Sequence, residues 1–266
     1  MQIDLTGKVT MITAGATKAG RLMAYEFAKS GSDLVVTYLP FQKEGADITK
    51  AEIEKMGRKC LALELNLREL DKFEGIIQKV DEEFGRLDTL IFNAGTDHVV
   101  PFEELTEEQW DDSNDVMAKS VAFLGREAAK LMMKHEHGRM IYIGGNSFYE
   151  NDPKCVGHGN AKFGGCKVMT ALAVVYTPYI QCNAVNMNMF YPCEESDFKN
   201  RETDYGQAMD NLGDTYEYHG RTWRCLDTKG VSEFLIFLAG CSDSCCINGA
   251  VIPMDCGMAL DTYRFM

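Results

Sequence analysis

Short apolar runs alternate with amphipathic stretches along most of the chain. The short runs are rich in β-branched residues and end at turn residues, as buried strands do, whereas the longer stretches repeat apolar residues at helical spacing. This pattern predicts strands at 8–13, 34–38, 60–64, 90–92, 140–143, 180–186 and 249–254. It predicts helices at 18–30, 43–57, 69–84, 108–134, 158–177 and 229–239.

The alternation of strands and helices predicts an α/β fold, a doubly wound parallel sheet (Rossmann fold) in a single domain over 1–266. Continuous apolar strands are typical of a parallel sheet that is covered on both faces, and right-handed crossovers give the doubly wound order. Residues 187–228 show no clear period. Because so long a connection in a compact domain usually covers a site or an interface, we interpret it as a lid or insert.

Composition limits the classes of partner. A chain of 266 residues with 45% apolar residues can bury one substantial core. Its net charge of −13 argues against nucleic acid or an anionic membrane surface as a partner. The N-terminal residues lack the pattern of a secretory signal, and no window approaches the roughly 18 apolar residues of a membrane span, so we expect a cytoplasmic protein.

The chain has ten cysteines, and none forms a Cys-x-x-Cys pair. Most interrupt apolar stretches, which favours buried, reduced thiols over a disulfide framework. Cys155 and His158 are spaced like half of a metal site, but zinc sites usually show two such pairs. We therefore expect no metal.

Several segments in the same order resemble those of the short-chain dehydrogenase/reductase superfamily. They are Leu5-Thr6-Gly7-Lys8-Val9, Phe92-Asn93-Ala94-Gly95, Asn183-Ala184-Val185 and Asn248-Gly249. The resemblance covers nearly the whole chain. It implies the Rossmann fold, a cleft for NAD or NADP, and a catalytic tetrad of Asn, Ser, Tyr and Lys.

The phosphate loop departs from the family pattern Thr-Gly-x-x-x-Gly-x-Gly. In register, this chain reads Thr13-Ala14-Gly15-Ala16-Thr17-Lys18-Ala19-Gly20, so only the last glycine is retained. A Cβ at either lost glycine obstructs the turn or the approach of the backbone to the pyrophosphate. Two features leave a rebuilt anion site open, because Lys18 could attract a phosphate and Gly15 could restore the turn by a one-residue shift.

Other dinucleotide contacts of the family are also changed. Tyr38 stands near the position of the acid or arginine that recognises the adenosine ribose, Asn66 replaces the adenine-contacting Asp, and Met187-Asn188 replaces a Pro-Gly pair. We expect that this chain itself binds no cofactor. The resemblance maps the vestigial cofactor site onto Thr13, Gly15, Lys18, Gly20, Tyr38, Asn66, Asn93 and Gly95.

The resemblance places the catalytic tetrad at Met117, Gly145, His158 and Lys162, so only the lysine is retained. Removing one positioned donor to a developing oxyanion typically raises the barrier by about 3–4 kcal/mol. A positioned acid or base contributes about 10²–10⁴ in rate. We therefore expect no catalytic residue in this chain.

The helices at 108–134 and 158–177 keep apolar stripes, and in the family the equivalent helices pair with a second subunit. The chain thus combines an altered site with retained assembly surfaces. In this combination it is similar to the non-catalytic subunit of the 2-(hydroxybenzyl)succinyl-CoA dehydrogenase of anaerobic toluene degradation. That resemblance implies a hetero-tetramer with an active paralogue that holds NAD. The complex would oxidise an alcohol of the 3-hydroxyacyl-CoA type.

Two alternatives stay open. The chain could be a divergent NAD(P)-dependent oxidoreductase that acts through His158 and Lys162, if Asn146 or Ser147 supplies the missing donor. It could instead be a sensor that binds a nucleotide or an acyl-CoA.

Overall fold

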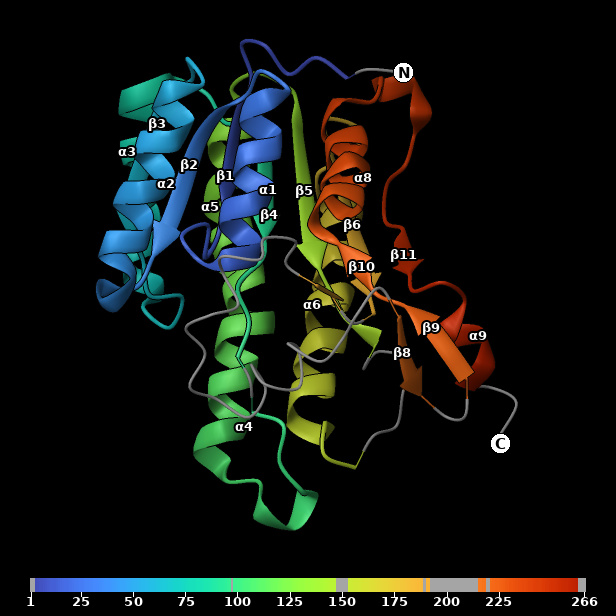
Figure 1. The fold of residues 1–266 in the computed structure, drawn as a ribbon. Helices are drawn as coiled ribbons and strands as arrows, with labels where there is room; N and C mark the ends of the chain where they lie inside the picture. Colours follow the sequence, from blue (N-terminus) through green and yellow to red (C-terminus); the bar gives the residue numbers. More distant parts are fainter. Residues whose placement is uncertain are drawn as a thin grey trace.

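The computed structural model describes residues 3–96, 98–146, 153–188, 190–191, 215–218 and 221–262. Its centre is a seven-stranded parallel sheet in the order β11-β6-β5-β4-β1-β2-β3, as Figure 1 shows. The strands are β1 (Val9–Ile12), β2 (Asp33–Tyr38), β3 (Cys60–Glu64), β4 (Thr89–Phe92), β5 (Gly138–Ile143), β6 (Ile180–Met187) and β11 (Val251–Met254). This order confirms the predicted doubly wound fold.

Helices cover both faces of the sheet. They are α1 (Lys18–Lys29), α2 (Lys43–Lys55), α3 (Phe73–Phe84), α4 (Glu107–Asn114), α5 (Ser120–Met133), α6 (Val156–Val175) and α8 (Thr228–Gly240), with α9 (Met258–Thr262) near the C-terminus. One core joins the sheet to α3, α5 and α6, and a second joins it to α1, α2 and α8. Because both faces are covered, β1, β5 and β6 are buried at every position.

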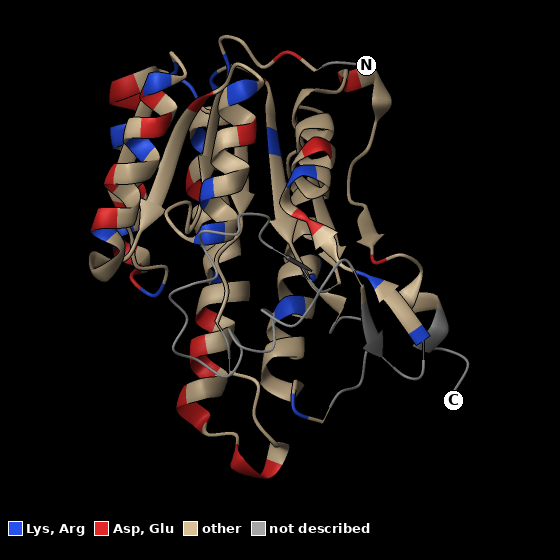
Figure 2. Cartoon of the chain, in the orientation of Figure 1, with Lys and Arg blue, Asp and Glu red and all other residues tan. Residues whose placement is uncertain are grey.

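The stretch predicted as one helix at 108–134 contains a π-helical turn over Asp115–Lys119, between α4 and α5. The helix begins with a capping box between Thr106 and Gln109. Figure 2 shows acidic residues, coloured red, along this start of the helix, where the helix dipole favours negative charge. The π turn carries Met117, whose side chain is fully buried. An extra residue in one helical turn re-aims the side chains around it and is frequent at functional sites.

The region predicted as a lid or insert, 187–228, is only partly described. Its described parts form two small pairs, a parallel one between β7 (Phe190–Tyr191) and β10 (Leu226–Asp227) and a hairpin of β8 (Thr215–Tyr218) and β9 (Arg221–Arg224). Residues 189, 192–214 and 219–220 lie outside the described residues. No helix within the described part of the chain is long and apolar enough to span a membrane.

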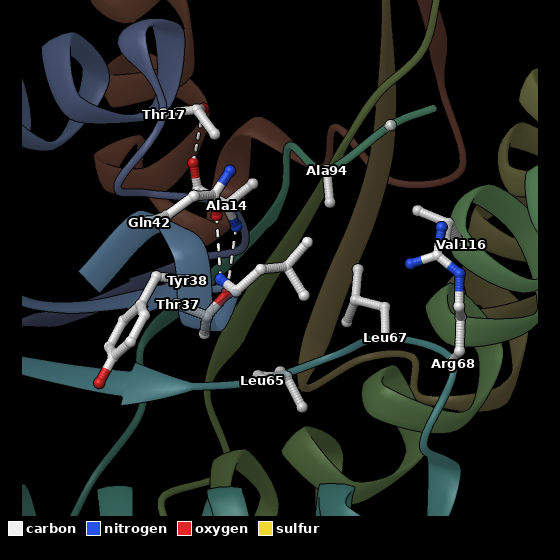
Figure 3. A pocket seen from close by; sticks show the side chains of 12 residues that line it. Ala14, Thr17, Thr37, Tyr38, Gln42, Leu65, Leu67, Arg68, Ala94 and Val116 are labelled. Carbon is white, nitrogen blue, oxygen red and sulfur yellow. Dashed lines mark hydrogen bonds between the residues drawn. The ribbon is translucent and has the colours of Figure 1, made fainter. Parts of the chain in front are cut away.

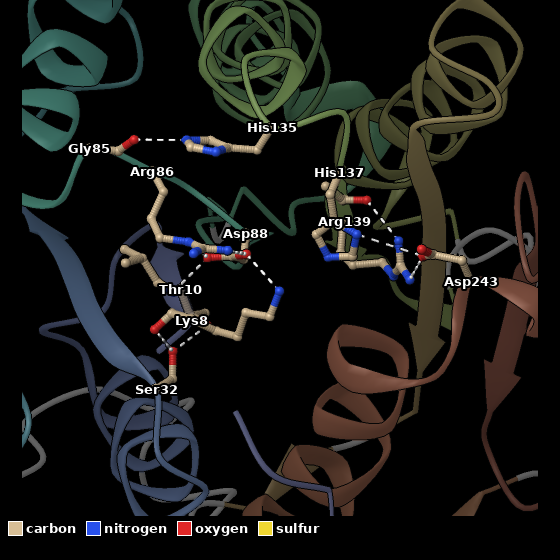
Figure 4. A network of polar contacts seen from close by, with 12 residues as sticks. Lys8, Thr10, Ser32, Gly85, Arg86, Asp88, His135, His137, Arg139 and Asp243 are labelled. Atoms are coloured by element: carbon tan, nitrogen blue, oxygen red, sulfur yellow. Dashed lines mark hydrogen bonds and ion pairs between the residues drawn. The ribbon is translucent and has the colours of Figure 1, made fainter. Parts of the chain in front are cut away.

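A buried carboxylate joins the starts of β1 and β4 (Figure 4). Asp88 accepts hydrogen bonds from the backbone N–H of Val9 (2.9 Å), from Lys8 Nζ (3.1 Å) and from Arg86 (2.6 and 2.8 Å). Burial by itself raises the pKa of Asp88, but these donors outweigh it and hold the pKa below its ordinary value of 3.8. The ionised side chain therefore stabilises this edge of the sheet.

A second buried polar contact lies at the same end of the sheet, where the strands begin. The guanidinium of Arg139, at the start of β5, is buried and donates to the carbonyl of Cys241 (3.2 Å) and to Asp243 (2.5 Å). Both acceptors follow α8, so this contact fixes the C-terminal end of that helix against the sheet.

Replacing Asp88 tests how much its ionised side chain stabilises the fold. Asp88→Asn keeps an acceptor for Val9 but removes the charge, so we expect the free energy of unfolding at pH 7 to fall by about 1–3 kcal/mol. Because the folded pKa is depressed, this stabilisation is complete above the ordinary pKa of 3.8 and is lost as pH falls from there through the lower folded pKa. Urea unfolding at several pH values should therefore show the two proteins converging in acid.

The exposed pair of Lys43 and Asp47 supplies the control. Asp47→Asn should change the free energy of unfolding by less than about 0.5 kcal/mol. A loss in Asp88→Asn that does not depend on pH would contradict the role given to the ionised carboxylate.

Candidate functional site

The loop between β1 and α1 makes a left-handed turn at Ala14. Its φ is +51°, a conformation that a Cβ disfavours by about 1–2 kcal/mol. Hydrogen bonds hold it there. Its N–H donates to Thr37 Oγ1 (3.0 Å), and its carbonyl accepts from Thr17 Oγ1 (2.7 Å) and Thr17 N (3.1 Å). The loop therefore keeps a turn that favours glycine although alanine stands there.

Two glycines let this loop pack tightly. A Cβ added at Gly20 would lie 2.3 Å from the carbonyl oxygen of Ala14, and one at Gly15 would lie 2.9 Å from the side chain of Val36. Thr17, the N-cap residue of α1, donates its hydroxyl to Ala14 instead of capping the helix. The Thr17 side chain therefore does not cap the first backbone N–H groups of α1, which are of the kind that can hold a phosphate at a helix N-terminus. The Cβ at position 14 therefore does not prevent the turn, contrary to that part of the prediction.

A pocket opens beside this loop (Figure 3). It lies near the point where the strand order reverses, since β2 lies on one side of β1 and β4 on the other. In doubly wound folds this point holds the adenosine half of a dinucleotide. The residues that line the pocket are Ala14, Thr17, Thr37, Tyr38, Leu39, Gln42, Leu65, Leu67, Arg68, Ala94, Gly95 and Val116.

The structure divides the positions mapped by resemblance. Tyr38 and Gly95 line the pocket. Thr13 and Asn93 join the ends of β1 and β4, because Asn93 donates its N–H to Thr13 Oγ1 (2.9 Å) and its amide to the Thr13 carbonyl (3.1 Å). Asn66 accepts from the backbone and the guanidinium of Arg68 (3.2 and 3.3 Å).

Lys162, the retained member of the tetrad, is buried below the far end of the cleft. Its Nζ donates to the carbonyl of Ile143 (2.9 Å) at the end of β5 and lies 5.5 Å from the centre of the Tyr142 ring. A Cβ added at Gly95 would lie 3.8 Å from Lys162 Nζ and 3.6 Å from Met117 Sδ. Lysine and methionine therefore lie close together, with a thioether where the family has an amide.

His158 lies at the first turn of α6, and its Nδ1 is 3.0 Å from the carbonyl oxygen of Thr96. Because a carbonyl only accepts, Nδ1 carries the proton, and in the neutral imidazole Nε2 is the acceptor. Gly145 contributes no side chain. Asn146 donates its amide to Met258 Sδ (3.1 Å), which directs it to the C-terminal segment, and Ser147 lies outside the described residues.

One charged cluster at the cleft was not predicted. Asp112 on α4 pairs with Arg68, which follows β3, and accepts from His98 Nε2 (2.7 Å). The hydrogen bond from Arg68 is the main reason that the pKa of Asp112 lies below its ordinary range. These residues are far apart in the sequence, so no local motif indicates them. The described residues contain no group of three or more metal-binding side chains.

Known proteins with similar sequences are oxidoreductases. The chain is 32% identical over 138 residues to 2-dehydro-3-deoxy-D-gluconate 5-dehydrogenase of Dickeya dadantii, covering 52% of this chain and 53% of that protein. It is 30% identical over 126 residues to hydroxynaphthalene reductase arp2 of Aspergillus fumigatus, covering 47% and 46%. These matches span about half the length of each relative. A dehydrogenase of the first name from Pseudoalteromonas atlantica is 25% identical over 96% of this chain and 97% of its own length.

Solved structures have the same fold. A protein assigned as a short-chain alcohol dehydrogenase from Sinorhizobium meliloti 1021 superposes with a TM-score of 0.79 at 27% identity, covering 97% of this chain and 98% of its own. NAD⁺-bound xylitol dehydrogenase superposes with a TM-score of 0.79 at 18% identity, covering 95% and 99%.

The expectation that this chain binds no dinucleotide is wrong. It relied on the lost glycines and on the changes at Tyr38, Asn66 and Met187-Asn188, yet the loop keeps its turn at Ala14 and its close packing at Gly20. The relatives are dehydrogenases and a reductase. The family model for short chain dehydrogenases matches residues 8–200. The chain therefore belongs to the short chain dehydrogenase family.

Proposed function

We propose that this chain is a subunit of a hetero-oligomeric dehydrogenase that binds a nicotinamide dinucleotide in its own cleft but lacks a working catalytic tetrad. An active paralogue in the complex would oxidise an alcohol of the 3-hydroxyacyl-CoA type, as in anaerobic toluene degradation. The observation that carries this proposal is the surrounding of Lys162. Its Nζ donates to the Ile143 carbonyl, the buried Met117 lies near it, and Gly145 offers no side-chain donor.

Binding of the dinucleotide is supported by the phosphate loop and the adjoining pocket. The N-terminus of α1 presents backbone N–H groups beside Thr17, and the pocket is lined by residues from the ends of β2, β3 and β4. When bound, the nicotinamide ring supplies the hydride acceptor for oxidation of an alcohol. The residues of this chain hold and orient that group.

Assembly is supported by apolar side chains that α5 and α6 expose. Val156, Phe163 and Val174 follow one another on the outer stripe of α6, and Val174 is 76% exposed. Phe123 on α5 is also exposed, with Arg126 stacked on its ring at 5.0 Å. Exposed apolar patches of this kind mark protein–protein interfaces.

A second candidate is an oxidoreductase that acts alone through His158 and Lys162. The hydrogen bond between His158 Nδ1 and the Thr96 carbonyl favours it, because it sets the tautomer in which Nε2 can accept a proton from an alcohol. This reading needs a donor to replace the missing serine.

The first prediction for this function concerns binding. Titration of the purified chain with NADH, followed by fluorescence, should saturate. Gly20→Ala should weaken binding by at least about tenfold, or 1.4 kcal/mol, because the new Cβ would lie 2.3 Å from the Ala14 carbonyl. Ala14→Gly should keep or strengthen binding, since glycine relieves the left-handed strain.

Gly75→Ala on α3 is the control, because nothing lies within 4 Å of its added Cβ. It should leave NADH binding unchanged and raise stability by up to about 1 kcal/mol. Failure of the unmodified chain to saturate with NADH or NADPH would contradict the proposal.

The second prediction concerns turnover. With NAD⁺ or NADP⁺ and a panel of 3-hydroxyacyl-CoA thioesters, the chain alone should produce no reduced dinucleotide, whereas the complex purified from its native cells should. His158→Gln in this chain should leave the activity of the complex within about twofold, because a residue outside the reacting centre contributes little to the barrier. Turnover by the chain alone that is lost in His158→Gln would replace the first candidate by the second.

The third prediction concerns assembly. Val174→Glu places a charge on the exposed stripe of α6, and we expect it to convert the oligomer to smaller species in sedimentation velocity, since an unpaired buried charge is costly. Phe41→Glu is the matched control, because Phe41 is 81% exposed on the segment between β2 and α2. Equal oligomeric states for both variants would exclude the α6 stripe as the interface.

A further inference from the structure

The side chains at the end of β2 are uncharged. In doubly wound folds this is the place that distinguishes NAD from NADP. NAD and NADP differ by a phosphate on the 2′-oxygen of the adenosine ribose. In doubly wound folds an acid at this place binds the ribose hydroxyls and repels the phosphate, whereas a nearby arginine attracts it. Tyr38 and Leu39 occupy this place and line the pocket. The Tyr38 ring is only 8% exposed and packs against Ala16 and Ala46.

Gln42 gives this end of the pocket a neutral donor. Its Oε1 accepts from the backbone N–H of Leu39 (2.9 Å), and this bond assigns the oxygen and nitrogen of the amide. The amide nitrogen is then the donor that the side chain can offer to the pocket. An N–H donor binds a ribose hydroxyl or a phosphate oxygen without requiring either.

The charge of Arg68 lies on the other side of the pocket. Figure 3 shows Arg68 across from Tyr38 and Gln42. Among the described residues that line the pocket it is the charged one, and its guanidinium is paired with Asp112 and Asn66. The exposed Lys43, which follows Gln42, pairs with Asp47. Arg68 and Lys43 are thus each paired with a neighbouring carboxylate, whereas Arg21 on α1 directs its guanidinium to the Ala16 carbonyl (3.4 Å).

We infer that this pocket accepts NAD and NADP with similar affinity, within about tenfold of each other. The inference rests on the proposed dinucleotide binding and extends it, because it states which dinucleotides the cleft takes. Selectivity is a difference between two affinities, and it needs a group that distinguishes the two ligands. Here Tyr38, Leu39 and Gln42 treat the 2′-hydroxyl and the 2′-phosphate alike.

Titration of the full chain with NADH and with NADPH at the same ionic strength, about 0.15 M, tests this inference. The two Kd values should agree within about tenfold. A ratio clearly above tenfold in either direction would overturn the inference and leave the proposed function intact. Absence of binding by both would overturn the proposed function and this inference together.

Variants at Leu39 sharpen the test, since this side chain is only partly buried and faces the pocket. Leu39→Asp should lower the affinity for NADPH relative to NADH by at least about tenfold, and Leu39→Arg should raise it by a similar factor. Leu39→Gln, uncharged and of similar size, should keep the ratio of the parent chain. If opposite charges at this position leave the ratio unchanged, the 2′ position is bound elsewhere and the inference fails.

Discussion

The close approach of α1 to the loop before it is the constraint on which the nucleotide end of the molecule depends. Gly20 packs so near the carbonyl of Ala14 that no side chain fits between them. That carbonyl faces the helix because Ala14 is left-handed. Thr17 donates two hydrogen bonds to the carbonyl, and Thr37 Oγ1 accepts one from the Ala14 N–H. The direction of α1, and therefore of its N-terminal N–H groups, follows from this contact.

A similar contact fixes the catalytic end. A Cβ added at Gly165 on α6 would lie 2.4 Å from both the Met117 carbonyl and the Tyr142 ring. The helix therefore packs directly on the π turn and on β5, and this packing places Lys162 below the cleft. A buried ammonium is stable only where acceptors meet it, and the Ile143 carbonyl and the Tyr142 ring contribute to that. The scaffold of the catalytic end thus persists around changed side chains.

The sheet could be predicted because each strand can be recognised from its own residues. Runs such as 90–92 and 140–143 are apolar on both faces, as is typical of a parallel sheet that is covered on both sides. The π turn at Asp115–Lys119 could not be predicted, since one extra residue hardly disturbs the apolar spacing of a long helix. Long-range pairing hid the cluster of Arg68, Asp112 and His98 in the same way.

The phosphate loop shows why a motif comparison alone gave the wrong expectation for the cofactor. The loss of glycine at position 14 was read as the loss of the turn. A Cβ in the left-handed region costs about 1–2 kcal/mol, and three hydrogen bonds at Ala14 can offset that cost. The missing glycine therefore indicates a strained residue in the turn, while the backbone of the loop keeps its shape.

There is a physical reason why the nucleotide end of the cleft can be retained while the tetrad positions at the other end change. A ligand that binds only the folded state stabilises it by about 2.7 kcal/mol at a hundred times its Kd. A dinucleotide held by a subunit that performs no chemistry would still add this stability to the fold. It would also hold the ends of β1, β2 and β4 together, since the pocket is lined from all three. The helices α5 and α6, which carry the proposed interface, pack on the core that includes Phe92 of β4 and Val35 of β2. In the proposed complex, a dinucleotide bound at the nucleotide end would therefore support assembly even though the tetrad positions have changed, because it would stabilise the core on which these helices pack.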